Sequence, residues 1–281
     1  MNSSAKPKRG YLNQDFKLFH IYDKRAMDFD SHSHDFHKII ICLSGSVTYI
    51  IEGKTYILSP WDILLVPKDM IHHSKTDSSL AYERIVLFID SEYLDTRDDS
   101  YTLSNCFRKS AEYGKCLFHA DGAARSDISS AADELEKALS FSENYGSLLL
   151  QQAAFIRLLV YINRLAANDD GLEGFVSDKR LENIISYINE HFADELSVGA
   201  LAQKFYMSRS YLMHKFKAVT GGSVYGYINQ KRLTSALAML RKGASASDAA
   251  KECGFSDYTV FYRSFKKMYG FSPGEVISGK Q

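Results

Sequence analysis

Residues 198–216 read VGALAQKFYMSRSYLMHKF and residues 247–265 read SDAAKECGFSDYTVFYRSF, so one pattern occurs twice in the carboxyl-terminal part of the chain. Each copy holds a short amphipathic stretch, a tight turn and a second amphipathic stretch that opens on a serine, Ser208 or Ser256. A serine hydroxyl can cap the free N–H groups of a helix, and apolar residues three and four apart form a stripe that packs on a neighbouring helix. The repeat predicts two helix-turn-helix units.

The segment between the two units, residues 225–242, has the periodicity of one continuous helix. A helix of about 18 residues is roughly 27 Å long, and one turn of a DNA duplex is about 34 Å. Two second helices held near this separation could enter successive segments of the major groove on one face of the duplex. The spacing therefore favours a DNA-binding domain.

At these residues the chain resembles the AraC/XylS family of bacterial transcription regulators. The matching positions, in family order and spacing, are Leu201, Ala202, Ser208, Tyr211, Leu212, Phe216, Lys217, Gly221, Arg232, Leu233, Ala236, Gly254, Phe255, Asp257, Phe261, Arg263, Phe265, Lys266, Lys267, Gly270, Ser272 and Pro273. The second unit departs from the pattern at Ala246, Ala249 and Val260, where the family usually has larger residues. We expect a softer core there, because each missing methylene forfeits about 0.8 kcal/mol of burial.

Charge is divided unevenly along the chain. The formal net charge of the 281 residues is zero, but residues 179–281 hold 15 Lys and Arg against 8 Asp and Glu. The length suits two domains, and a hydrophobic content of 45% supplies a core for each. A basic half joined to an acidic half is expected when a nucleic-acid-binding domain is fused to a domain with another role.

Cysteine usage and hydropathy indicate a cytoplasmic protein. Cys42, Cys106, Cys116 and Cys253 have neither a metal-binding spacing nor a paired framework, which is typical of reduced thiols. Residues 1–10 are polar and basic, and no run approaches 18 apolar residues. We expect no export signal and no membrane contact.

The amino-terminal half changes from an expected mobile arm, residues 1–15, to a β-rich region. Short β-rich runs at 17–22, 37–43, 46–52, 54–58, 62–66 and 82–90 alternate with turn signals. This spacing indicates a sandwich or barrel. His32, His34, Gly45, Pro67 and His72 also follow the order of the two cupin motifs, and that resemblance implies a cupin-like barrel.

The histidines raise the question of a metal ion. Cupin metal sites use two histidines one residue apart, a carboxylate four residues on and a third histidine, because alternate strand residues face one interior. Lys38 stands at the carboxylate position, and its positive charge disfavours a metal. We therefore expect no metal and no other cofactor.

Two other interpretations of the histidines stay open. They are polar residues with satisfied hydrogen bonds at the barrel mouth, or they hold a small polar effector. The expected effector-binding residues are His32, His34, Lys38, Tyr49, Trp61 and His72, with Tyr49 or Trp61 as a stacking surface. An inward Lys38 requires an anionic partner, either Asp35, Asp62 or Asp69, or an acidic ligand; the alternative is an outward, solvated Lys38.

Two helical patterns follow the strands, at residues 126–141 and 145–166. The second has a wide apolar stripe, which indicates that one face packs on the barrel and another on a partner helix. The family resemblance favours a homodimer, with Phe155 and Leu159 as candidate seam positions; the alternative is that both helices cap the barrel. The expected fold class is α+β: a cupin-like β-barrel with two packing helices over residues 16–167, a linker over 168–178, and an all-α domain over 179–281 with two helix-turn-helix units joined by a long helix.

The amino-terminal part of the second helix in each unit is expected to read DNA. By matching the family pattern, Ser210, Met213 and His214 face bases, while Arg209 and Lys215 are better placed for phosphates. In the second unit the outward residues are Tyr258, Thr259, Tyr262 and Arg263, and Arg263 can grip guanine O6 and N7 with two hydrogen bonds. Lys267 is expected to attract the phosphate backbone without reading sequence.

The sequence therefore predicts a DNA-binding transcription regulator, with activation as the expected effect, whose barrel senses a carbohydrate or sugar acid. The resemblance implies double-stranded DNA, a homodimeric partner and RNA polymerase as the macromolecules it meets. No catalytic residue is expected. Two rivals remain: a metal-dependent cupin enzyme fused to a DNA-binding domain, and a constitutive regulator with a ligandless barrel.

Overall fold

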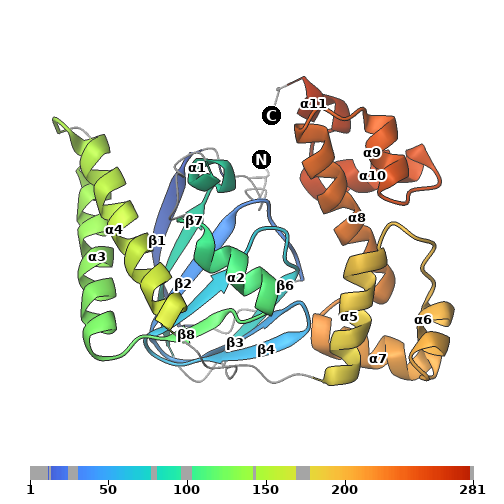
Figure 1. Ribbon diagram of the computed structural model, residues 1–281, viewed down its shortest axis with the longest axis horizontal. Coiled ribbons are helices and arrows are strands. Elements are labelled where there is room, and N and C mark those ends of the chain that lie inside the picture. The colour runs from blue at the N-terminus through green and yellow to red at the C-terminus, as the bar shows by residue number, and fades with distance from the viewer. Residues whose placement is uncertain are drawn as a thin grey trace, which may run out of the picture.

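The computed structural model describes residues 12, 14–24, 31–76, 81–95, 103–141, 144–168 and 178–278. Most of the expected arm and residues 169–177 of the expected linker lie outside the described residues. Two domains stand side by side, a β-rich domain with two flanking helices and a helical domain (Figure 1). This arrangement matches the expected α+β fold class.

Two antiparallel sheets form the barrel. The five-stranded sheet has the order β1-β7-β2-β5-β8 and the three-stranded sheet has the order β4-β3-β6. The strands are β1 (Phe16–Asp23), β2 (His37–Ser44), β3 (Val47–Ile51), β4 (Lys54–Leu58), β5 (Asp62–Val66), β6 (His72–Thr76), β7 (Tyr82–Ile89) and β8 (Leu117–His119).

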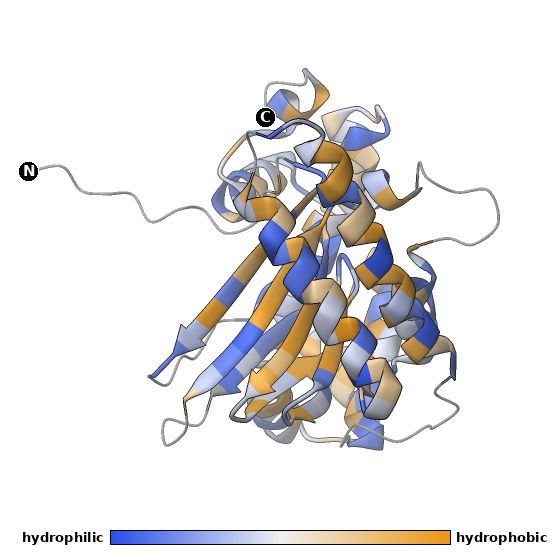
Figure 2. Ribbon diagram, turned by 90° about the vertical axis from the view of Figure 1, so that its left-hand side faces the viewer, coloured by the Kyte–Doolittle hydropathy of each residue, from blue (hydrophilic) through white to orange (hydrophobic). Residues whose placement is uncertain are grey.

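Both faces of the larger sheet are buried, because successive side chains of a strand point to opposite faces. Ile40 and Val86 point into the barrel, whereas Ile39 and Leu87 point outward under two long helices, α3 (Gly122–Ser140) and α4 (Ser147–Asn168). Figure 2 turns this covered face toward the viewer, with apolar residues along the strands and helices. Two shorter helices, α1 (Ser91–Asp95) and α2 (Asn105–Tyr113), precede β8.

The prediction that Phe155 and Leu159 of α4 lie in a homodimer interface is wrong. Phe155 and Leu159 are completely buried in the core that α4 shares with α3 and the larger sheet. The wide apolar stripe continues at the amino-terminal end of α4, where Leu148, Leu149 and Leu150 are 63%, 70% and 64% exposed. The helix therefore covers the barrel with one part and leaves another apolar part uncovered.

The helical domain has two small cores joined by the long helix α8 (Val224–Arg241). The first unit comprises α6 (Val198–Lys204) and α7 (Arg209–Thr220), packed with α5 (Lys179–His191). The second comprises α9 (Ala246–Glu252) and α10 (Tyr258–Tyr269), followed by α11 (Pro273–Ile277). The predicted repeat and its connecting helix are confirmed.

Caps fix where these helices begin. Ser208 accepts a hydrogen bond from the backbone N–H of Tyr211 at 3.2 Å, as predicted. In the second unit the cap is Asp257, not Ser256: the Asp257 carboxylate accepts from the N–H of Thr259 at 2.6 Å, and the helix starts one residue later. Val260 is 44% exposed, so the missing side-chain volume expected there does not weaken the core.

Candidate DNA-binding surface and ligand pocket

The two second helices, α7 and α10, present the predicted DNA-reading residues outward. Leu212, Phe216, Phe261 and Phe265 are completely buried and turn these helices so that their opposite faces are free. The exposed residues of the predicted set are Arg209, Ser210, Met213, His214, Tyr258, Thr259, Tyr262, Arg263 and Lys267.

Two lysines of that set also make contacts away from the expected DNA surface. The Lys215 ammonium lies 3.3 Å from the carboxylate of Asp178, which caps α5, so this lysine also ties α7 to α5. Lys267 lies on a side of α10 that lines the cavity between the two domains. Lys267 is therefore placed to contact a ligand in this cavity, in addition to its expected role at the phosphate backbone.

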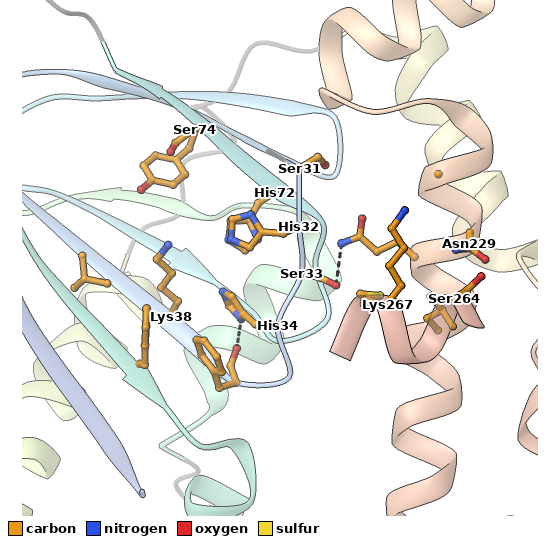
Figure 3. A pocket seen from close by; sticks show the side chains of 18 of the residues that line it. Ser31, His32, Ser33, His34, Lys38, His72, Ser74, Asn229, Ser264 and Lys267 are labelled. Carbon is orange, nitrogen blue, oxygen red and sulfur yellow. Dashed lines mark hydrogen bonds between the residues drawn. The ribbon is translucent and has the colours of Figure 1, made fainter. Parts of the chain in front are cut away.

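A cavity of about 1070 Å³ lies between the barrel and the helical domain. Its barrel side includes five of the six expected effector-binding residues: His32, His34, Lys38, Tyr49 and His72. Its helical side is formed by Tyr225, Gly226, Asn229, Gln230 and Leu233 of α8 and by Ser264, Lys267 and Met268 of α10. Figure 3 shows the histidines and Lys38 on one side, and Asn229 and Ser264 on the other.

Trp61 does not join this cavity. It sits in the turn before β5 with a positive φ of 70°, and the Arg125 guanidinium lies 4.5 Å from the centroid of its ring. Its side chain packs against the core between the larger sheet and the helices. The prediction that Trp61 stacks on the effector is therefore wrong, because the turn directs it to the other side of the sheet.

Two histidines point unpaired nitrogens into buried space. His34 Nδ1 donates to the carbonyl of Phe36 at 2.7 Å, and His72 Nδ1 donates to the carbonyl of Met70 at 3.0 Å. Each Nε2 is then an acceptor, and neither has a hydrogen-bond partner among the described residues. Burial lowers the pKa of both histidines well below 6.5, and the nearby charge of Lys38 adds to this effect. Both rings are therefore neutral.

Lys38 faces the barrel interior. Its ammonium lies 5.8 Å from the ring centroid of Tyr49 and 5.9 Å from that of Phe88, so the outward alternative is wrong. Two of the three carboxylates weighed as its partner are engaged elsewhere: Asp35 pairs with Arg241 at 2.5 Å and Asp62 with His119 at 2.7 Å.

Arg84 is a pocket residue that sequence reasoning missed. One guanidinium nitrogen, NH2, donates to the carboxylate of Asp23 at 2.7 Å, and the group stacks 4.5 Å from the ring centroid of Tyr82. The other terminal nitrogen, NH1, is buried and has no partner within the described part of the chain. The signal was present: Tyr82, Arg84 and Val86 alternate along β7, so Arg84 shares the inward face with two apolar residues.

The described residues contain no cluster of three or more His, Cys, Asp or Glu side chains arranged to hold a metal ion. The three histidines are nevertheless close, with ring centroids 4.4 Å apart for His32 and His72 and 4.8 Å apart for His34 and His72. Together with Lys38 and Arg84 they form a polar, positively charged surface suited to hydrogen-bonding a small molecule.

The turn between β3 and β4 docks on the helical domain through Glu52. One oxygen of its carboxylate lies 2.6 Å from the Lys231 ammonium, and the other accepts from Asn189 at 2.8 Å and from the Tyr227 hydroxyl. Burial raises the pKa of Glu52, but the charge of Lys231 and these hydrogen bonds outweigh burial and hold it below 4.5. Gly53 follows with φ of 79°, and a Cβ there would lie 2.2 Å from Cδ1 of Ile185.

The fold and the two surfaces define a ligand-binding domain fused to a domain that reads DNA. Known proteins agree with this class. The model of the AraC-like ligand binding domain matches residues 19–155, and the model of a helix-turn-helix domain matches residues 201–278. The chain belongs to the AraC family of DNA-binding transcription regulators.

Curated relatives share nearly the full length. The transcriptional activator RhaS of Enterobacter sp. (strain 638) is 26% identical over 253 residues, which cover 90% of this chain and 88% of that protein. RhaS of Escherichia fergusonii is 26% identical over 266 residues with the same coverage. Among solved structures, ToxT from Vibrio cholerae O395 is 14% identical, with a TM-score of 0.40, over 94% of this chain and 97% of that one.

One described helix, α4, is long and apolar enough to cross a membrane by length and composition. Part of its surface is packed on α3 and the larger sheet, as expected for a helix that covers the barrel.

Proposed function

We propose that the protein is a cytoplasmic transcription activator that responds to a small polar effector, a carbohydrate or sugar acid, bound in the cavity between its domains. The observation that carries the proposal is that barrel strands and two helices of the DNA-binding domain line one cavity. A ligand in that cavity touches both domains, so it can favour one arrangement of the DNA-reading helices over another. The RhaS relatives are named activators, which supports the sign of regulation.

The proposed effector contacts are His32, His34, Lys38, Tyr49 and His72. The neutral Nε2 atoms of His34 and His72 accept hydrogen bonds from ligand hydroxyl groups, which suits a polyhydroxylated molecule. A ligand of this kind also relieves the cost of two buried nitrogens that have no partner in the described residues.

The proposed DNA contacts are the exposed residues of the two reading helices. Ser210, Met213 and His214 of α7 face base edges and Arg209 lies toward phosphates; on α10, Arg263 reads guanine beside Tyr258, Thr259 and Tyr262. Lys215 and Lys267 attract the phosphate backbone of the DNA without reading its sequence. RNA polymerase is the proposed partner of the DNA-bound form.

A second copy of the chain is the proposed partner of α4. Leu148, Leu149 and Leu150 are each more than 60% exposed, and Phe141 and Tyr145 beside them are 61% and fully exposed. Five large apolar side chains at one end of the α3–α4 hairpin form a surface that a symmetric copy can cover. Burying each of them contributes about 1.5–3 kcal/mol.

Thermal unfolding of the full chain across a panel of sugars and sugar acids tests the effector proposal. A true effector at about 100 times its Kd adds near 2.7 kcal/mol to stability. His34→Ala should abolish that gain, while the control His20→Ala, on an exposed histidine bound to Glu83 and Glu136, should retain it. A ligandless barrel would show no gain with any compound, and a metal-dependent enzyme would purify with stoichiometric metal.

A further inference from the structure

We infer that residues 31–35 restrain the second DNA-reading unit, because this segment contacts both the effector cavity and the connecting helix α8. Ser33 and Asp35 are its positioning residues. The inference rests on the proposed function, since it names the part of the barrel through which the cavity acts on the DNA-binding domain. In this arrangement the chain without effector binds DNA weakly, and an effector that shifts the segment releases the second unit.

The segment faces both the cavity and α8. The side chains of His32 and His34 line the cavity, whereas those of Ser33 and Asp35 contact α8. The Gln230 amide donates a hydrogen bond to the Ser33 hydroxyl at 3.1 Å, which Figure 3 marks as a dashed line. Consecutive residues of one segment therefore join two proposed ligand contacts to the helix that connects the DNA-reading units.

The contacts with α8 extend to the last residue of this helix. The Ser33 hydroxyl lies 3.3 Å from that of Thr234, which is buried, and the Asp35 carboxylate lies 2.5 Å from the Arg241 guanidinium. Arg241 ends α8, and Ser245 then caps α9, the first helix of the second unit. Movement of the segment therefore displaces the part of α8 that leads into the second unit.

Backbone hydrogen bonds tie the same segment to the third histidine of the cavity. His32 and His72 exchange two N–H···O bonds, of 3.0 and 2.8 Å, and the N–H of Asp69 donates to the carbonyl of His34 at 2.8 Å. The Asp69 carbonyl accepts from the Lys231 ammonium of α8 at 3.4 Å. A ligand that moves His34 or His72 therefore disturbs contacts with α8, because these groups belong to one hydrogen-bonded network.

The position of α10 gives the direction of the effect. Ser264 and Lys267 of this reading helix line the cavity. Lys267 follows Arg263 by four residues, so the two side chains are neighbours on one helix face. The barrel is therefore held beside the edge of the DNA-reading surface. DNA that approaches Arg263 competes with the barrel for this side of α10, so release of residues 31–35 strengthens DNA binding.

Fluorescence anisotropy of the full chain, without added effector and on a duplex selected from randomised DNA, tests the inference. Asp35→Asn should tighten binding by about fivefold or more. The side chains of Asp35 and Arg241 are 16% and 35% exposed, so the loss of this pair leaves the fold intact. The control Glu190→Gln removes the same charge from an exposed position of α5 and should change the affinity by less than about twofold.

A double-mutant cycle separates the loss of this contact from a general effect of charge. In an Arg241→Gln background, Asp35→Asn should have no further effect, because its partner is already lost. On a duplex in which the half-site bound by α10 is scrambled, the gain should also disappear. Unchanged DNA affinity in Asp35→Asn, or a gain that persists in either comparison, overturns the inference.

Hydrogen exchange followed by mass spectrometry tests the link to the cavity. Coupling is reciprocal, so DNA binding should disturb the cavity wall if the wall restrains DNA binding. Amides of residues 31–36 and 69–72 should exchange faster when the wild-type chain binds the duplex, and equally fast with and without DNA in Asp35→Asn. Unchanged exchange in the wild-type chain overturns the link.

The two proposals fail separately, because none of these measurements needs an effector. If no sugar or sugar acid stabilises the chain in thermal unfolding, the proposed effector is refuted, while the contact between residues 31–35 and α8 is still tested by DNA affinity. If Asp35→Asn leaves DNA affinity unchanged, the restraint is refuted and the thermal result is unaffected.

Discussion

Replacing Glu52 with glutamine removes a buried negative charge from the contact between the β3–β4 turn and the helical domain. The side chains of Glu52 and Lys231 are 11% and 16% exposed, and their charged atoms are 2.6 Å apart. Glutamine leaves the Lys231 ammonium buried beside a neutral amide. Breaking a buried pair by removing one partner costs about 3–5 kcal/mol. At 1.4 kcal/mol per factor of ten, docking of the domains should weaken by about 100-fold or more.

Scanning calorimetry of the full chain measures this loss. The wild-type chain should unfold in one cooperative transition, because each domain stabilises the other, whereas Glu52→Gln should show two. Glu190→Gln is the control: this exposed α5 residue bonds Ser186 within its own helix, at 3.1 Å. A single transition in Glu52→Gln, with a stability change below about 0.5 kcal/mol, would refute the argument that this carboxylate holds the domains together.

Acid should reproduce the effect of the substitution. The folded-state pKa of Glu52 lies below its ordinary 4.5, so its contribution is complete above pH 4.5 and is lost as the pH falls through the folded-state pKa. Burial raises the pKa of Asp69, nearby in the same interface, to about 6, so Asp69 acts in the opposite direction, stabilising the folded state as the pH falls from 6 toward 3.8. Comparing wild type with Glu52→Gln at each pH cancels the Asp69 contribution. The difference between the two proteins should shrink below pH 4.5.

Three further outcomes are expected. DNA affinity, followed by fluorescence anisotropy, should fall steeply between roughly 50 and 200 mM salt because phosphate contacts release counterions, and a flat response would rule out that origin. In a selection from randomised duplexes, Arg263→Ala should relax the preference at one base pair by about 1–3 kcal/mol, while Lys267→Ala should weaken every sequence alike; equal effects would remove the distinction between base and phosphate contacts. In sedimentation, Leu149→Glu should yield folded monomers, whereas Leu159→Glu should unfold the domain by placing a charge in its core; a Leu149→Glu dimer would exclude this face as the seam.

Local patterns were sufficient for most of the fold. The strands at 54–58 and 62–66 were predicted with their observed bounds, and the helix expected at 225–242 spans Val224–Arg241. These elements have strong periodicity or clear turn signals at both ends. In contrast, β6 begins with His72 and His73 and lacks an apolar alternation, and it is a strand because β3 pairs with it. A local sequence pattern does not predict which distant segments pair as strands.

The sequence predicted only part of the site, because local patterns identify some of its residues but not the long-range packing that brings them together. His32, His34 and His72 were identified by spacing, and they meet in one cavity. Trp61 was wrongly assigned to the pocket because it has a positive φ that the sequence does not predict. This backbone conformation directs its side chain to the face of the larger sheet opposite the cavity. Arg84 was overlooked because an isolated charge in an apolar strand is usually solvated. The runs predicted at 46–52 and 54–58 imply a turn at Glu52 and Gly53, and β3 and β4 pair on either side of it. No local signal indicates that this turn contacts Asn189 and Lys231, more than 130 residues further along the chain.

The docked corner at Glu52 and Gly53 also limits how freely the two halves of such proteins can be exchanged. In a chimera that joins this barrel to the helical domain of a relative, the acidic, tightly fitting β3–β4 turn meets a helical surface that evolved to receive a different turn. Unless the recipient helices supply a cation and an amide at the places of Lys231 and Asn189, the hybrid has an orphan buried carboxylate at its junction. Recombination between such genes therefore has a compatibility requirement at one hairpin, and engineered sensors built by swapping domains should transfer the β3–β4 turn together with the surfaces of α5 and α8 that receive it.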